Sequence, residues 1–209
     1  MSFTILIPTI NRKDLLVEAL EWYCENLPNT EILILDNGNQ DIPCLTEKVW
    51  IWESEINLGV AGSWNFLIEK AIQGREQNFL ILNDDIILKK SELEIDAMIA
   101  MGSPMTFHRP RAFYNWSAFI LRKSVFDLVG EFDINFEKCF FEDNDYEYRM
   151  RLKGVEIKYE DGLAPEVYRN SMTIQKDPLL GGYIENREYY IEKWGGLPTE
   201  EKYKIPFNK

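Results

Sequence analysis

The sequence has few cysteines and a single histidine, which limits the kinds of site it can build. Cys24, Cys44 and Cys139 are widely separated and odd in number. This spacing argues against a disulfide framework and against a metal knuckle, and it favours reduced thiols in a cytoplasmic protein.

Long hydrophobic runs are also missing. No apolar stretch approaches the roughly 18 residues that a membrane span requires. The first residues, MSFTILIPTINRKD, carry neither a basic leader nor a small-residue cleavage site. We therefore expect a soluble protein without a transmembrane segment, located in the cytoplasm, or in the cytoplasm of the host cell if it is viral. The chain is compatible with being one domain of a larger polypeptide.

Basic residues are outnumbered by acidic ones. The chain has 23 Lys and Arg residues against 35 Asp and Glu residues, which is a formal net charge of −12. The basic residues are scattered among acidic ones, so no positive stripe can neutralise a phosphate backbone. The sequence therefore predicts no nucleic acid partner.

The sequence does contain enough apolar material for one core. Hydrophobic residues make up 45% of the 209, which predicts a single domain over residues 1–209. In the first hundred residues, apolar runs typical of strands alternate with amphipathic stretches typical of helices. The expected strands lie within 2–8, 30–39, 48–53 and 78–85, and the expected helices within 11–26, 60–74 and 91–101. This order predicts an α/β fold with a mostly parallel central sheet flanked by helices.

Local signals mark several helix ends. Asn11 is the expected N-cap of the first helix, Gly74 is the expected end of the second, and Ser91 and Glu94 have capping-box spacing. After residue 100 the chain becomes aromatic-rich. There we expect a strand-like region and a short helix within 112–133, a helix ending at Gly154, short strands within 155–160 and 164–169, and a terminal helix within 184–196.

Polar residues follow three of the predicted strands. They are Pro8 to Arg12, Asp36 to Gly38, and Asn83 to Asp85. Because ligands of open parallel sheets collect at the carboxyl ends of the strands, these residues predict a ligand site at that edge.

Asp84 and Asp85 come directly after an apolar run. Two adjacent carboxylates on an acidic protein repel each other and any phosphorylated substrate unless a cation lies between them. Mg²⁺ and Mn²⁺ take oxygen ligands of this kind, with substrate phosphates completing the shell. The alternative is a solvated turn after a strand.

A second acidic group lies in FFEDNDYEYRMRLKG. Glu142, Asp143 and Asp145 cluster at a predicted helix start, where the helix dipole favours negative charge. Pairing of Asp145 with Arg149 at i,i+4 spacing is a sufficient structural explanation. The functional alternative is a general base that takes a proton from an alcohol as its oxygen attacks.

The motifs taken in order resemble the GT-A glycosyltransferases, in particular family 2, over roughly residues 3 to 172. The matching segments are ILIPTINRKDLL, ILILDNGN, NLGVAGSWNFLIEKA, LILNDD, AFILRKSVFDLVGEFDINF and FFEDNDYEYRMRLKG. The resemblance implies a Rossmann-like GT-A fold, with residues 1–100 as the nucleotide-sugar-binding half and 101–209 as an acceptor-binding and catalytic half with a small β/α lobe. It also implies inverting transfer of one sugar from a nucleoside-diphosphate sugar, with UDP as the first choice, to a hydroxyl of a glycan or glycoprotein acceptor.

The resemblance implies roles for particular residues. Asp85 would bind Mn²⁺ or Mg²⁺, and Asp143 would be the catalytic base, with Glu142 and Asp145 as substitutes. The residues implied to contact the nucleotide sugar are Pro8, Thr9, Asn11, Arg12, Asp36, Asn57, Gly62, Asn83 and Asp84.

The chain departs from the family pattern at two places. Asn83 replaces the first Asp of the DxD-type motif, a form similar to that of rhamnosyltransferase-like members. Where many relatives have a histidine near the last strand, this chain has Arg169 and Asn170, which leaves open whether the metal has a third protein ligand and makes Arg169 a candidate phosphate contact. The size and acidity are also loosely similar to the small glycosyltransferase domains of chlorella-virus capsid-glycosylating proteins.

Two other functions remain as alternatives. A nucleotidyltransferase that makes a nucleotide sugar also has an α/β sheet and metal-binding carboxylates, but PTINRKD lacks the glycines of its phosphate loop. The other alternative is a carbohydrate- or nucleotide-binding module that keeps the fold without turnover.

Overall fold

The computed structural model of the chain describes residues 3–101, 105–108, 115–160, 163, 167–168 and 182–209. Their centre is a seven-stranded sheet with the order β3-β2-β1-β4-β7-β6-β8. Its strands are β1 (Thr4–Thr9), β2 (Glu31–Asp36), β3 (Val49–Glu53), β4 (Asn78–Leu82), β6 (Met105–His108), β7 (Ala118–Arg122) and β8 (Ile157–Glu160). A separate two-stranded sheet joins β5 (Ile86–Ile87) to β9 (Val167–Tyr168).

The sheet is parallel at its centre. β1 pairs in parallel with β2 and with β4, and β2 pairs in parallel with β3. β7 is antiparallel to both β4 and β6, whereas β6 and β8 are parallel. The predicted mostly parallel sheet is confirmed, and the reversed strand β7 marks the change from the first half of the chain to the second.

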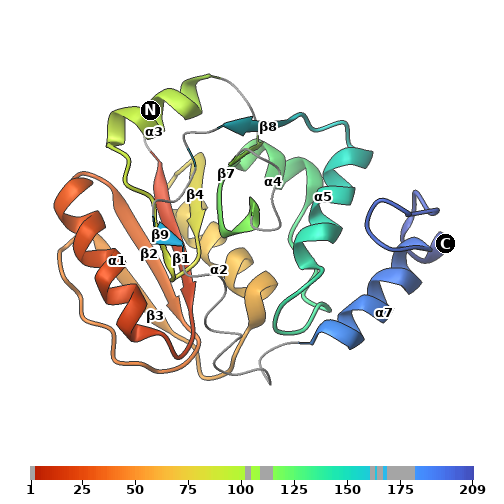
Figure 1. The fold of residues 1–209 in the computed structure, drawn as a ribbon, viewed down its shortest axis with the longest axis horizontal. Coiled ribbons are helices and arrows are strands. Elements are labelled where there is room, and N and C mark those ends of the chain that lie inside the picture. Colours follow the sequence, from red (N-terminus) through yellow and green to blue (C-terminus); the bar gives the residue numbers. More distant parts are fainter. Residues whose placement is uncertain (1–2, 102–104, 109–114, 161–162, 164–166, 169–181) are drawn as a thin grey trace.

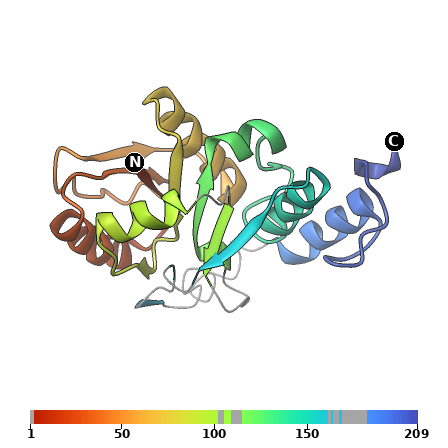
Figure 2. The same ribbon diagram turned by 90° about the horizontal axis from the view of Figure 1, so that it is seen from above.

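Helices cover both faces of the sheet (Figure 1). They are α1 (Lys13–Asn26), α2 (Gly59–Gln73), α3 (Glu92–Ala100), α4 (Lys123–Val129), α5 (Glu142–Leu152) and α7 (Tyr183–Trp194). Figure 2 shows α1 and α7 at opposite ends of the molecule. None of the helices in the described part of the chain is long and apolar enough to cross a membrane.

Alternation of side chains along β1 divides the core into two layers. Ile5 and Ile7 belong to a cluster with residues of α1 and α3, and Leu6 belongs to a cluster with residues of α2, α4 and α5. Because successive strand residues point to opposite faces, a strand covered on both sides is apolar throughout. This explains why the sequence shows a continuous apolar run rather than alternation.

A third apolar cluster joins α7 to the rest of the chain. It contains Phe136, Phe141, Tyr190 and Trp194, all buried. Its location beside α5 makes the terminal helix a support for the segment that leads into α5 (Figure 1).

Two of the predicted helix ends are confirmed, and two need correction. Ser91 and Glu94 form the expected capping box of α3, and Gly74 is the C-cap of α2. The N-cap of α1 is Arg12 rather than Asn11, because Asn11 adopts a left-handed conformation with φ of 56°. Helix α5 has Lys153 as its C-cap, one residue before Gly154.

Two expected strands are described only in part. Within 112–133, the described strand is Ala118–Arg122, which is preceded by a 3₁₀ turn at Asn115–Ser117 and followed by α4, the expected short helix. Within 164–169, the described strand is Val167–Tyr168, which pairs with β5 outside the main sheet. The other residues of 164–169, and residues 112–114, lie outside the described part of the chain.

Candidate functional site

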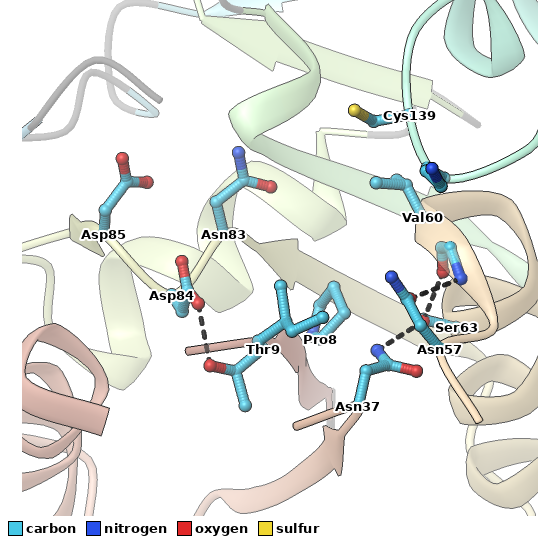
Figure 3. Close-up of a pocket in the computed structure, with 13 residues that line it drawn as sticks. Pro8, Thr9, Asn37, Asn57, Val60, Ser63, Asn83, Asp84, Asp85 and Cys139 are labelled. Carbon is cyan, nitrogen blue, oxygen red and sulfur yellow. Dashed lines mark hydrogen bonds between the residues drawn. The ribbon is translucent and has the colours of Figure 1, made fainter. Parts of the chain in front are cut away.

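A cleft of about 710 Å³, including its open mouth, lies at the carboxyl ends of β1 and β4 and beside the start of α2. Strand-end residues and helix α2 supply most of its lining, and the segment before α5 supplies the remainder. The lining residues are Pro8, Thr9, Ile10, Asn37, Asn57, Gly59, Val60, Ser63, Asn83, Asp84, Asp85, Lys138 and Cys139. The expected ligand edge of the sheet therefore carries a cleft (Figure 3).

Thr9 and Asp84 join the ends of two neighbouring strands inside the cleft. The hydroxyl of Thr9 donates a hydrogen bond of 2.7 Å to Oδ2 of Asp84. Burial raises the pKa of Asp84 to about 7, and the adjacent Asp85 adds to this, although the Thr9 hydroxyl acts in the opposite direction. The main cause of the raised pKa is burial, the charge of Asp85 is a smaller one, and the charge of Arg12 acts in the opposite direction. A divalent cation beside the two carboxylates would favour their ionised forms.

The turn after β4 holds its acidic residues in the cleft. Its backbone is anchored to Ser117, because Asn83 donates from its backbone N–H to the carbonyl of Ser117 at 2.9 Å and from Nδ2 to Ser117 Oγ at 3.3 Å. Asp84 and Asp85 are only 7% and 5% exposed. Figure 3 shows the side chains of Asn83 and Asp85 pointing the same way while Asp84 turns toward Thr9.

The start of α2 forms the opposite wall. Asn37 links this wall to the end of β2, since its Oδ1 accepts from Leu58 N–H at 3.0 Å and its Nδ2 donates to Ser63 Oγ at 2.9 Å. Asn57 Oδ1 accepts from Gly59 N–H at 2.9 Å. The N–H groups of Leu58 and Gly59 are therefore engaged within the chain, and what the helix start offers a bound anion is the positive end of its dipole.

Gly59 permits the segment before α5 to close the cleft. Its φ is +68°, and a Cβ at this position would lie 2.8 Å from the backbone nitrogen of Lys138. Val60 N–H donates to the Lys138 carbonyl at 2.6 Å. A side chain at position 59 would therefore push away the backbone of Lys138. The segment that brings Lys138 and Cys139 to the cleft would move with it.

Glu142 and Asp143 lie at the first turn of α5, beyond Cys139. Burial raises the pKa of Asp143 to about 6, and burial together with Asp143 raises the pKa of Glu142 well above its ordinary value. Both carboxyls also contribute to the raised pKa of Cys139, so they lie close to a residue that lines the cleft. Because the two carboxyls titrate as a pair, together they are candidates to accept a proton near neutral pH.

Asp145 takes part in a buried ion network instead. Its carboxylate accepts from Trp194 Nε1 at 2.8 Å and forms ion pairs with Arg149 at 2.8 Å and Lys193 at 2.6 Å. Asp145 is fully buried. These contacts bear out its expected i,i+4 partner and hold α5 against α7.

The cleft collects some of the sequence-predicted residues and leaves others outside its lining. Those that line it are Pro8, Thr9, Asn57, Asn83, Asp84 and Asp85. Those described elsewhere are Asn11, Arg12, Asp36, Gly62, Glu142, Asp143 and Asp145. Arg169 and Asn170 lie outside the described residues.

Two of the residues outside the lining are engaged by their own loops. Asp36 is fully buried and accepts from the N–H groups of Gly38 at 2.8 Å and Gln40 at 2.6 Å. Arg12 donates to Asp14 from Nε at 3.1 Å and from Nη2 at 3.2 Å. Both therefore shape the turns behind the cleft.

Asn37 lies in the cleft as expected of the strand-end segment 36–38, although the sequence assigned it no individual role. Other lining residues were not expected from the sequence. Ser63 lies in the segment 57–71 that resembles a family motif, and this was the available signal. Lys138 and Cys139 carry no such signal, because they reach the cleft only through a long-range contact with Gly59. Among the described lining residues, Lys138 is the only one with a positively charged side chain.

The donor atoms present fit a divalent metal only in part. Asp84 and Asp85 offer the oxygen ligands that Mn²⁺ and Mg²⁺ prefer. Within the described ranges, no group of three His, Cys, Asp or Glu residues could together hold a metal. The residues therefore fit a metal held by one or two carboxylates, with a bound phosphate completing its coordination.

No family model and no curated protein matches the sequence. The structure is similar to GalNAc-T7 with UDP, GalNAc and Mn²⁺, with a TM-score of 0.64 and 11% identity over 93% of this chain and 48% of that one. It is similar to the mannosyltransferase PcManGT from Pyrobaculum calidifontis in complex with GDP-Man and Mn²⁺, with a TM-score of 0.57 and 14% identity over 78% of this chain and 55% of that one.

A third similar structure is a putative nucleotide-diphospho-sugar transferase from Desulfovibrio desulfuricans G20, with a TM-score of 0.50, 17% identity and coverage of 77% of this chain and 80% of that one. The chain thus spans about half the length of GalNAc-T7 and PcManGT. At these identities the likeness establishes the fold. The predicted GT-A-like α/β fold is confirmed, and its similar structures are nucleotide-sugar transferases.

Proposed function

We propose that the protein is a metal-dependent, inverting glycosyltransferase that transfers one sugar from a nucleoside-diphosphate sugar to a hydroxyl of a glycan or glycoprotein acceptor. The observation that carries the proposal is the buried pair Asp84 and Asp85, which lines one cleft together with the start of α2 in a GT-A-like fold. Solvated turn residues would be exposed, so burial favours a ligand function over the structural alternative.

The donor occupies the cleft with its diphosphate between the two walls. Pro8, Thr9 and Asn57 contact the donor, and Asn83 and Asp84 lie beside its ribose or sugar. Lys138, the cation of the described lining, is available to pair with the diphosphate. The remaining nucleoside-site candidates, Asn11, Arg12, Asp36 and Gly62, act by shaping the turns and the helix start around it.

Asp85 is the principal metal ligand, with Asp84 beside it. These carboxylates would hold Mn²⁺ or Mg²⁺, which would supply positive charge to offset the negative charge developing on the departing nucleoside diphosphate. The Thr9 hydroxyl keeps Asp84 in place through its 2.7 Å hydrogen bond. The similar structures of GalNAc-T7 and PcManGT contain Mn²⁺, which supports this choice of ion.

Asp143 is the general base for the acceptor. As the acceptor oxygen forms its bond to the anomeric carbon, the bond from that carbon to the phosphate oxygen breaks, and the hydroxyl proton passes to the Asp143 carboxylate. Attack and departure on opposite faces of the sugar invert the anomeric centre in one displacement. A base of this kind contributes about 10²–10⁴-fold to the rate.

The proposal is tested by screening nucleotide sugars with Mn²⁺ and with Mg²⁺ for thermal stabilisation and for slow donor hydrolysis. UDP-sugars are the first set, and nucleotide-linked rhamnose is included because of Asn83. A ligand that binds only the folded state raises the melting temperature, so we expect stabilisation that requires both metal and diphosphate. Stabilisation by nucleosides alone, or by no compound, would contradict the proposal, and pyrophosphate release from a nucleoside triphosphate and a sugar phosphate would instead indicate a nucleotidyltransferase.

A further inference from the structure

The segment that connects the cleft to the acidic pair of α5 has an unusual backbone. Lys138, Phe140 and Phe141 have positive φ angles of 61°, 81° and 70°. Residues with side chains rarely adopt such angles, and bulky aromatic residues do so least. A conformation of this kind persists only where surrounding contacts determine it. The segment also separates Cys139, which lines the cleft, from Asp143, the proposed base.

One side chain from α7 holds this backbone. Asn186 is 2% exposed, and its Nδ2 lies 2.8 Å from the carbonyl oxygen of Glu137, 2.9 Å from that of Cys139 and 3.0 Å from that of Phe140. Its Oδ1 accepts from the N–H of Glu137 at 3.1 Å. All four contacts are to main-chain groups, so the amide recognises the shape of the segment rather than its side chains.

Helix α7 packs closely against the segment whose backbone Asn186 contacts. A Cβ at Gly182, the N-cap of α7, would lie 3.1 Å from the carbonyl oxygen of Glu137. At the other end of the helix, Lys193 and Trp194 bond to Asp145 of α5. The two ends of α7 therefore hold the segment and the helix that follows it, and Figure 1 shows α7 beside α5.

We propose that Asn186 is a positioning residue for the transfer reaction: by fixing the backbone of residues 137–140, it sets the distance from Asp143 to the donor bound at Asp85. The inference rests on the proposed function, since it assigns a catalytic consequence to a contact outside the cleft. Asn186 touches neither the cleft lining side chains nor the proposed reacting atoms. Its effect passes through the main chain alone.

The experiment compares two variants of Asn186 with a control on the same helix. Asn186→Ala removes the amide, and Asn186→Asp keeps its volume but places a carboxylate against three carbonyl oxygens. The control is Tyr190→Phe, which removes a 2.7 Å hydrogen bond to Glu201 but keeps the ring that packs against Phe141. For each protein we would measure hydrogen exchange of the amides of residues 137–143, the donor dissociation constant and kcat.

We expect both Asn186 variants to exchange faster at residues 137–143, with Asp more severe than Ala. A displacement near 1 Å lowers a rate by about 100-fold, so kcat should fall by that order while the donor dissociation constant stays within about threefold. Tyr190→Phe should leave exchange of this segment and kcat unchanged, even where its melting temperature falls.

The outcomes distinguish failure of the positioning role from failure of the proposed function. Unchanged exchange at residues 137–143 in Asn186→Asp, or normal kcat despite faster exchange, overturns the positioning role. An equal loss of kcat in Tyr190→Phe would show that Asn186 contributes only to the general stability of the fold, and this also overturns the positioning role. A wild-type protein that turns over no nucleotide sugar overturns the proposed function and the catalytic role together, whereas an active wild type with unaffected variants overturns this inference alone.

Discussion

The Thr9 hydroxyl donates a 2.7 Å hydrogen bond to Asp84 across the ends of β1 and β4, although 75 positions separate the two residues. Thr9 is 3% exposed and Asp84 is 7% exposed, so the bond is shielded from water. Parallel pairing of the two strands is what brings them together. The hydrogen bond holds the carboxylate of Asp84 against Thr9. Asp85 is the second carboxylate of this turn that lines the cleft.

Thr9→Val should lower both stability and donor binding. Valine keeps the shape of threonine but removes the hydroxyl, and a buried polar group that loses a partner costs about 1–3 kcal/mol. The free energy of unfolding in urea should fall by about that amount. Thr9→Ser, which keeps the hydroxyl, is the matched control, and equal losses in the two variants would show that the methyl group, not the hydrogen bond, matters.

Asp85→Asn should remove metal-dependent turnover while the protein stays folded. The variant is nearly isosteric and loses the charge that holds the cation. We expect the rate of donor turnover to fall by about 10²–10³-fold, the scale of one lost transition-state contact, as measured across a Mn²⁺ titration. Asp127→Asn on α4, an exposed acidic residue paired with Lys123, serves as control. Wild-type Mn²⁺ dependence in the Asp85 variant would move the metal elsewhere.

Asp143→Asn should abolish transfer but preserve donor binding. We expect a loss of about 10²–10⁴-fold in kcat and an unchanged donor dissociation constant by calorimetry. Burial raises the pKa of Asp143 to about 6, so the wild-type rate should fall as pH drops below about 6, when the base becomes protonated. Because Glu142 adjoins it, the midpoint belongs to the pair. A variant that keeps transfer, or a wild type without this acid limb, would assign the base to another group.

Titration of the Asp143 carboxyl also changes the stability of the protein. The rate falls as pH drops, whereas the stability falls as pH rises. Its pKa is about 6 in the folded protein and 3.8 in the reference state, so between these values the folded state holds a proton that the unfolded state has released. Stability contributed by this group is therefore present at low pH and declines as pH rises toward 6. In Asp143→Asn, the pH dependence of unfolding over this window should be flatter than in the wild type.

Lys193→Met should be strongly destabilising. Lys193 is 5% exposed and pairs with both Asp133 and Asp145 at 2.6 Å. Removing one partner of a buried ion pair costs about 3–5 kcal/mol, because the remaining charges stay buried. The matched control is Lys123→Met, whose partner Asp127 is exposed, and which should cost no more than about 1 kcal/mol. Similar urea midpoints for the two variants would contradict the difference in burial as the cause.

Much of the first half of the fold was predictable from the sequence. The runs around Ile5 and Leu80 are continuous and apolar because both faces of the sheet are covered, and that pattern indicates a parallel sheet. The capping box at Ser91 joins residues only three positions apart, so it was also predictable from the sequence. Parallel strands end at the same edge of the sheet. The sequence therefore also predicted that Thr9, Asp84 and Asp85 lie close together.

The second half was less predictable, because its contacts are not local. The left-handed conformation of Phe140 and Phe141 contradicts their intrinsic preference and depends on Asn186, more than 40 positions further along the chain. The pairing of Val167 and Tyr168 with β5 likewise joins segments far apart in the chain. No periodicity in the sequence encodes either arrangement.

By itself, the sequence determined the alternation of strands and helices in the first half of the chain, the net acidic charge, and the acidic residues that end β4 and begin α5, since these depend on residue type and local spacing. Only the tertiary structure decided that Thr9 donates a hydrogen bond to Asp84 and that Asp145 forms an ion pair with Lys193. The tertiary structure also decided that Lys138 lies at the cleft, where its backbone packs against Gly59. Each of these contacts joins segments far apart in the chain. Their partners are selected by packing, which depends on the whole fold at once.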